Sequence, residues 1–294
     1  MTPSSPSDRW SHWLLHRRHG DDPSELARTL ARLGPVRDRV LDNGQVCTGD
    51  TVLDVGTGDG LIAFGALERV GDQGHVIFSD ISESLLDHTR WHADQLDIAS
   101  PHSFVRASAD DLVSIANESV DVVTTRSVLA YVGNKEQAFA EFSRVLHPQG
   151  RISLYEPINR LTHPEPGLLF GGYDVGPVQD LASKIKAVFA RRQPLGSDPM
   201  FDYDERDLLA FAKRSGFAEV HLELHVDVAP QAPQRWEIYA GTAPNPIAPT
   251  IDEAMAEALT PGERNRFTRH LRPLVETGDG VFAVAVAYLW GAKA

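Results

Sequence analysis

The sequence predicts an α/β protein built on a doubly wound, mostly parallel β-sheet. From Thr51 onward, short apolar runs alternate with amphipathic stretches, as in parallel strands joined by crossover helices. A glycine-rich turn follows the first apolar run, where a backbone can approach a ligand closely. The nearly all-apolar run Val281–Leu289 is typical of a strand buried within a sheet.

Composition and charge narrow the class of protein. The chain of 294 residues is 42% hydrophobic and 23% charged, and its net charge of -13 would repel a phosphate backbone, so we expect no nucleic-acid partner. Cys47 is the single cysteine, which excludes an intramolecular disulfide and fits a reducing cytoplasm. No apolar run has the length of a membrane-spanning helix, and Met1–Asp8 is interpreted as a flexible leader without signal-peptide character. We therefore expect a cytoplasmic protein without a membrane partner.

Residues 1–50 are expected to form an N-terminal helical segment. Asp22 is a helix N-cap followed by proline, and Gly34 is expected to end that helix before a second, shorter one begins after Pro35. The segment Trp10–Arg18 is a candidate lid over the ligand site.

Residues 51–157 are expected to form the ligand-binding core. Asn134 starts one of its helices, because Gln137 follows three residues later as in a capping box. The strands of this core are expected at Val52–Val55, His75–Ser79, Ser103–Val105, Val120–Thr124 and Arg151–Tyr155. The helices between them are expected at Leu61–Val70, Ser84–Leu96 and Lys135–Leu146.

The regular alternation stops after Pro157. Residues 158–217 are expected to form a cap insertion, rich in glycine and proline, and a following helix. Ala218–Val228 alternates strictly between apolar and polar residues, which predicts a half-exposed strand at the edge of the sheet. Residues 218–294 thus supply the last two strands of the core, with a helical insertion at 229–279 between them.

The glycine-rich turn after the first strand is the most informative segment. Gly56 and Gly58 flank Thr57 and leave room for a ligand at the N-terminus of the following helix. A dinucleotide-binding loop requires its third glycine at position 61, which is Leu61 here. Asp54 lies two residues before the first glycine, where a carboxylate would repel a pyrophosphate but suits the ammonium and sulfonium of S-adenosylmethionine.

Two further positions fit the nucleoside part of this ligand. Asp80 ends the second strand, about 20 residues after the loop, where a carboxylate accepts from both ribose hydroxyls. Ile81 would then lie against the adenine. After the third strand, the Asp110 carboxylate is expected to accept from the adenine amino group, and the backbone of Ala109 to Asp111 to meet the ring nitrogens.

Taken in order, these elements resemble the class I S-adenosylmethionine-dependent methyltransferases, especially the branch that methylates quinones and other small molecules. The resemblance covers about residues 50–157 and implies a Rossmann-like sheet of seven strands with the last one reversed. It also implies S-adenosylmethionine as donor and S-adenosylhomocysteine as product. Ser108 stands where many relatives have aspartate, and relatives often carry a histidine near Tyr131. The elements that carry the resemblance are the glycine-rich loop, Asp80, Ala109–Leu112, Val120–Val123 and Arg144–Gly150.

In this family the acceptor lies over the carboxyl ends of the fourth and fifth strands. Tyr131 and Glu156 are the candidate catalytic bases, needed only if the acceptor carries a proton at neutral pH. Arg126 and Arg160 are candidates for holding an acidic acceptor or the carboxylate of the donor. The side chains expected to contact the substrate are Tyr131, Asn159, Arg160, Tyr173 and Trp236.

We therefore expect methyl transfer to an oxygen, nitrogen or carbon of a small-molecule substrate, in secondary-metabolite or quinone-type biosynthesis. A homodimer is one possible oligomeric state. One alternative is a protein or peptide methyltransferase, for which an open groove would replace a closed pocket. Another is a non-catalytic module that binds S-adenosylmethionine. A nicotinamide oxidoreductase is disfavoured by Leu61.

Histidine patterns outside these motifs are interpreted as structural. Histidine and acidic residues alternate along His221–Asp227, and such polar alternation keeps an edge strand soluble. His88 and His92 lie one helical turn apart and are expected at the surface. We expect no metal site.

Overall fold

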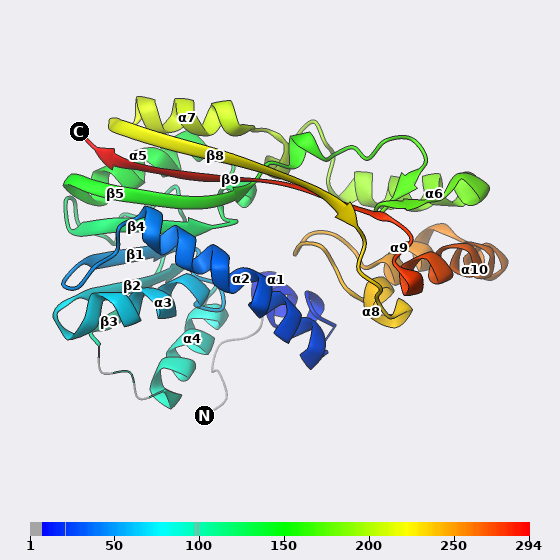
Figure 1. Cartoon of the computed structure of the whole chain (residues 1–294), viewed down its shortest axis with the longest axis horizontal. Helices are drawn as coiled ribbons and strands as arrows, with labels where there is room; N and C mark the ends of the chain where they lie inside the picture. The colour runs from blue at the N-terminus through cyan, green and yellow to red at the C-terminus, as the bar shows by residue number, and fades with distance from the viewer. Residues whose placement is uncertain (1–7, 21, 97, 99) are drawn as a thin grey trace.

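The computed structural model describes residues 8–20, 22–96, 98 and 100–294. The expected leader therefore lies outside the described residues, except for Asp8, which caps the first helix. One sheet of seven strands forms the core, in the order β3-β2-β1-β4-β5-β9-β8 (Figure 1). Its strands are β1 (Thr51–Val55), β2 (His75–Asp80), β3 (His102–Arg106), β4 (Val120–Arg126), β5 (Leu146–Pro157), β8 (Phe217–Pro230) and β9 (Val281–Lys293).

The direction of the strands confirms the predicted fold class. β1 to β5 are all parallel to one another, whereas β9 is antiparallel to both β5 and β8. β9 therefore lies within the sheet as the reversed strand, and β8 forms its edge, as the apolar run and the strict alternation predict.

Helices cover both faces of the sheet. On one face, α2 (Pro23–Asn43), α3 (Leu61–Val70) and α4 (Glu83–Gln95) bury an apolar cluster that includes Leu41, Ile62 and Phe78. On the other face, α5 (Lys135–Val145) and α7 (Glu205–Arg214) pack on a second cluster that includes Phe139, Phe142 and Leu208. The described residues also form short helical turns, namely η1 (Trp13–Arg17), η2 (Gly71–Gln73), η3 (Leu129–Tyr131), η4 (Asn159–Leu161), η5 (Gly176–Val178) and η6 (Pro199–Phe201).

One prediction about the N-terminal helices is wrong. α2 is a single helix that continues through Gly34 and Pro35, where we expected an end and a new start. Leu33 and Leu41, on either side of the proline, are both buried. The continuous apolar face that they form keeps the helix intact, because its packing outweighs the local cost of proline inside a helix.

The two insertions pack together into one body, called the cap below. It contains α6 (Gln179–Arg192) from the first insertion and α8 (Trp236–Gly241), α9 (Ile251–Ala258) and α10 (Pro261–Thr277) from the second. The first insertion also contributes a small antiparallel pair, β6 (Leu169–Phe170) with β7 (Tyr173–Asp174). Ile185, Met255 and Phe267 belong to the apolar core of the cap. Segments far apart in sequence thus fold into a single unit.

The cap is connected to the sheet by the long strands β8 and β9. β5 ends where Pro157 pairs with Val286, but β8 and β9 continue as a two-stranded ribbon to the pair Pro230–Val281. Figure 1 shows the cap at this end of the sheet, where the short N-terminal helices α1 (Arg9–His12) and η1 also lie. Among the described residues, no helix is long and apolar enough to cross a membrane.

Candidate functional site

The glycine-rich loop connects β1 to α3 in the conformation that its glycines permit. Gly56, Gly58 and Gly60 have φ angles of 66°, 58° and 84°. The loop is held to the neighbouring strand because the Thr57 N–H donates to the carbonyl oxygen of Ser79 at 2.8 Å. A Cβ at Gly56 would lie 2.4 Å from Cγ2 of Val128, so only glycine fits at this position.

Asp54 lies beneath this loop and is 2% exposed. The Thr124 hydroxyl donates to its Oδ1 at 2.8 Å, and burial raises the pKa of the carboxyl to about 6. Among the described residues, its Oδ2 has no hydrogen-bonding partner, and neither do the buried Thr57 Oγ1 and Asp59 Oδ1. Buried oxygens without partners are costly, so this cluster fits a ligand that brings a cation and hydrogen-bond donors.

Asp80 organises the loop from the neighbouring strand. Its carboxylate accepts from the N–H of Gly58 at 3.0 Å and from the N–H of Ser82 at 2.9 Å, while burial raises its pKa. Next to it, Ile81 is 41% exposed, although it is a large apolar residue. The arrangement leaves a carboxylate and an apolar surface side by side, as the predicted ribose and adenine contacts require.

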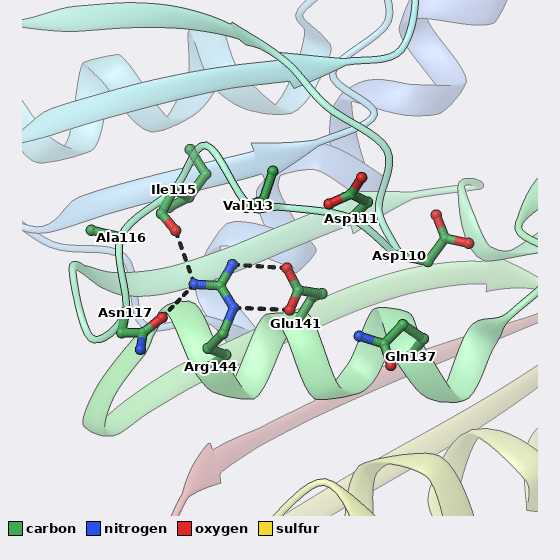
Figure 2. Close-up of a pocket in the computed structure, with 9 residues that line it drawn as sticks. All are labelled: Asp110, Asp111, Val113, Ile115, Ala116, Asn117, Gln137, Glu141 and Arg144. Atoms are coloured by element: carbon green, nitrogen blue, oxygen red, sulfur yellow. Dashed lines mark hydrogen bonds and ion pairs between the residues drawn. The ribbon is translucent and has the colours of Figure 1, made fainter.

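The turn after β3 lies next to Asp80, because the Ala107 N–H donates to the carbonyl oxygen of Asp80 at 3.1 Å. Ala109 is buried in the core, and the Ser108 hydroxyl donates to Asp110 Oδ1 at 2.5 Å. Asp110 and Asp111 line an open groove of about 420 Å³ beside α5, and Figure 2 shows the Asp110 carboxylate pointing away from Arg144. Their predicted contacts with adenine stay a prediction.

The N-terminal segment lies against the glycine-rich loop. A Cβ at Gly58 would be 3.1 Å from Cδ2 of Leu14, and the Trp10 ring packs edge-on against Tyr131 with centroids 5.0 Å apart. Burial lowers the pKa of Arg18 to about 10, and the nearby Arg126 adds to the effect. The positive charge of Arg126 thus acts on the Arg18 guanidinium, and an anion bound near both would be favoured.

The same segment also contacts the cap. The Trp13 indole donates to the carbonyl oxygen of Ala243 at 2.8 Å, and the Ala243 N–H donates to the carbonyl oxygen of Arg17 at 3.1 Å. Arg17 forms an ion pair with Glu253 at the start of α9. The segment therefore bridges the loop and the cap, and its role as a lid stays a prediction.

The carboxyl ends of β4 and β5 bring the candidate catalytic residues together. Glu156 is fully buried and accepts from the Thr125 hydroxyl at 3.0 Å and from the N–H groups of Val128 and Ala130 at 2.9 and 3.4 Å. These contacts hold the loop after β4 around the carboxylate, and the role of Glu156 as a base stays a prediction. Burial raises the pKa of Tyr131 to about 12, so its phenol is protonated at neutral pH.

The other expected substrate contacts lie further from the loop. The Asn159 amide donates to the carbonyl oxygen of Met200, and Arg160 forms a long ion pair of 3.8 Å with Asp204. Tyr173 and Trp236 are buried in the apolar core of the cap. Little of the surface of these two rings is exposed, and their expected contact with the substrate stays a prediction. No group of three metal-binding side chains occurs among the described residues.

Comparison with known proteins agrees with this geometry. The family model of a methyltransferase domain matches residues 48–168. The nocamycin O-methyltransferase of Saccharothrix syringae is 34% identical over 207 residues, which are 68% of this chain and 70% of that protein. The ubiquinone/menaquinone biosynthesis C-methyltransferase UbiE of Vibrio campbellii is 36% identical over 37% of this chain and 41% of its own length. The YcgJ protein of Bacillus subtilis has the same fold, with a TM-score of 0.54 at 16% identity, over 87% of this chain and 97% of that one.

The fold and the loop define a Rossmann-like α/β protein with a nucleoside site at the carboxyl ends of its strands. The chain belongs to the class I S-adenosylmethionine-dependent methyltransferases, and it is an enzyme that uses S-adenosylmethionine.

Sequence reasoning missed two of the residues that build this site. Thr124 pairs with Asp54 across β1 and β4, and the register of two strands cannot be seen in either strand alone. Leu14 contacts the loop from the N-terminal segment, and no local pattern distinguishes it from other leucines.

Proposed function

We propose that this enzyme methylates a small-molecule acceptor that is enclosed between the carboxyl ends of β4 and β5, the N-terminal segment and the cap. The observation that carries the proposal is the double contact of that segment, with the loop through Leu14 and with the cap through Trp13 and Arg17. A segment held on both sides favours a closed pocket over the open groove that a peptide needs. We further propose that it acts as a lid.

When bound, S-adenosylmethionine supplies a methyl group on a sulfonium that leaves without protonation. Asp54 and Thr57 would hold its ammonium and carry the buried oxygens that lack partners. Asp80 would accept the ribose hydroxyls, and Ile81 would contact the adenine together with the turn at Ala109 to Asp111. Arg126 and Arg18 would hold a carboxylate, either that of the donor or that of an acidic acceptor.

Glu156 fixes the loop that carries Tyr131, and this loop would form the floor of the acceptor pocket. At its high pKa, Tyr131 would orient the acceptor as a hydrogen-bond donor. Positioning of this kind accounts for most of the rate in a displacement whose leaving group is already activated. Asn159 and Arg160 would lie at the rim of the pocket.

We propose an oxygen as the methylated atom, because the nocamycin O-methyltransferase matches 68% of this chain and is named for transfer to oxygen. Secondary-metabolite biosynthesis is the matching context, and quinone methylation is the second candidate, because UbiE matches the donor-binding part.

The test is transfer from methyl-labelled S-adenosylmethionine into a cell extract that is then separated into small molecules and macromolecules. We expect label in the small-molecule fraction. The labelled product should be a methyl ester, which base hydrolyses, or a methyl ether, which base does not cleave. Asp54→Asn in the same extract is the matched control and should abolish the signal. Label only in protein would overturn the proposal in favour of a peptide acceptor. Donor binding without transfer to either fraction would favour the non-catalytic module.

A further inference from the structure

The outer edge of the sheet carries a row of exposed apolar side chains that methyl transfer does not use. Leu224, Val226 and Val228 on β8 lie on one face and are 39%, 53% and 69% exposed. Single exposed apolar residues are ordinary, but three in a row on an edge strand form a template for pairing with another strand. Their neighbours on β9 are too small to cover them, namely Ala287, Ala285 and Ala283.

The opposite face of the same stretch carries alternating charges. Glu223 is already paired within the chain, with Arg39 and with the His225 ring. Asp227 is exposed, and its carboxylate forms no hydrogen bond or ion pair with any residue that the structure describes. The apolar row and the Asp227 carboxylate both lie in the second half of β8.

We propose that this half of β8 pairs antiparallel with β8 of a second copy of the chain, about a two-fold axis at Val226. In this register Val226 faces Val226 of the partner, and Leu224 faces Val228 of the partner. On the other face His225 lies opposite Asp227 of the partner, and the pair occurs twice by symmetry. The sheets of the two copies then become one continuous sheet.

Charge complementarity favours a second copy of the chain as the partner. It also favours a two-fold axis that passes through an even-numbered residue of β8. Along His221–Asp227 histidine and acidic residues alternate, so an axis at an even position places an acid opposite a histidine. An axis at an odd position would place acid opposite acid and histidine opposite histidine, which is unfavourable. A strand from an unrelated protein would not be expected to satisfy this self-complementary pattern.

The packing of α7 selects Val226 among the even positions. Val220 and Leu222 are half-buried against the core cluster beneath α7. Figure 1 shows α7 alongside the first half of β8 only. The second half, where the exposed side chains lie, is open to a partner strand.

The mass of the full chain in solution is the first test, by light scattering during size-exclusion chromatography. We expect a dimer for the wild type and a monomer for Val226→Lys. Val113→Lys is the matched control, because Val113 is 78% exposed in the turn after β3 and should leave the dimer unchanged. A wild type that is monomeric throughout, or a dimer that Val226→Lys leaves intact, overturns the proposal.

Disulfide cross-linking tests the axis. In a Cys47→Ser background, Val226→Cys should cross-link to itself, since antiparallel neighbours lie within disulfide reach. Leu224→Cys and Val228→Cys should cross-link efficiently only when the two variants are mixed. Self-cross-linking of Leu224→Cys in preference to Val226→Cys would overturn the register.

Charge reversal supplies a readout that a purely apolar contact would not give. His225→Asp places like charges opposite each other and should dissociate the dimer, and adding Asp227→His should restore it. Failure of the second change to restore the dimer, with both variants folded by circular dichroism, would contradict the pairing. All of these readouts are independent of methyl transfer.

Discussion

The indole Nε1 of Trp13 donates a hydrogen bond of 2.8 Å to the carbonyl oxygen of Ala243, which lies 230 residues further along the chain. This bond fastens the proposed lid to the cap, on the side opposite to the glycine-rich loop. The lid and the cap are therefore linked, and opening one should disturb the other.

Loss of this bond should loosen the lid. Trp13→Phe keeps an aromatic ring, although a smaller one, and removes the donor; a hydrogen bond contributes about 1 kcal/mol, or roughly fivefold in an equilibrium. We expect faster hydrogen exchange in residues 9–18 and donor binding weakened by a few-fold. Trp91→Phe, at an exposed tryptophan on α4, should change neither. Unchanged exchange in Trp13→Phe would mean that the bond does not hold the lid.

Donor affinity should depend on pH through Asp54. Its pKa of about 6 means that the carboxyl is protonated in acid, and the ammonium of the donor binds the ionised form. The dissociation constant, measured by calorimetry, should therefore rise as the pH falls below 6, by up to about tenfold per unit. Asp54→Asn should bind the donor weakly at every pH. If donor binding by this variant still depended on pH, another group would cause the dependence.

Ionisation of Asp54 should also lower the stability of the ligand-free enzyme. The folded state keeps its proton up to about pH 6, whereas an unfolded aspartate loses it near its model value of 3.8. The free energy of unfolding that this group contributes therefore falls as the pH rises from 3.8 to 6. Thermal unfolding of wild type and Asp54→Asn across this range should differ in slope, with the smaller decline in the variant.

The tight contact between Gly56 and Val128 predicts a specific loss of function. Gly56→Ala would place a Cβ 2.4 Å from Val128 and should greatly weaken donor binding. Gly49→Ala is the control, because Gly49 also has a positive φ, of 91°, but nothing lies within 4 Å of its added Cβ. Partial recovery in the double variant Gly56→Ala with Val128→Ala would show that the collision, and not only the backbone angle, causes the loss.

Glu156 should act through the loop and not as a base. Glu156→Gln replaces one accepting oxygen with an amide donor, so a backbone N–H loses its partner at a cost of about 1–3 kcal/mol. We expect a lower kcat with an unchanged pH–rate profile. If one titrating limb of the pH–rate profile disappeared in Glu156→Gln, Glu156 would instead be the catalytic base.

Tyr131→Phe offers the matching test for the phenol. Because its pKa is about 12, the hydroxyl should serve as a donor to the acceptor, and its removal should raise KM for the acceptor more than it lowers kcat. Loss of a limb in the pH–rate profile would instead identify Tyr131 as the base.

The sequence predicts the core well because most of its strands contain a short apolar run and the glycines of the loop have a local reason. It fails where distant segments decide the structure. α2 runs through Pro35 because its face packs on the sheet, which no local signal announces. The burial of Tyr173 and Trp236 likewise depends on the packing of the two insertions against each other, which the sequence does not show.

The position of β9 has a consequence for synthesis on the ribosome. β8 is translated some fifty residues before β9, yet β9 lies between β8 and β5. The nascent chain therefore holds β8 without a neighbour, and β5 with one bare edge, until β9 has emerged. Chaperones that shield unpaired strands should associate with this intermediate, and their release should coincide with the insertion of β9.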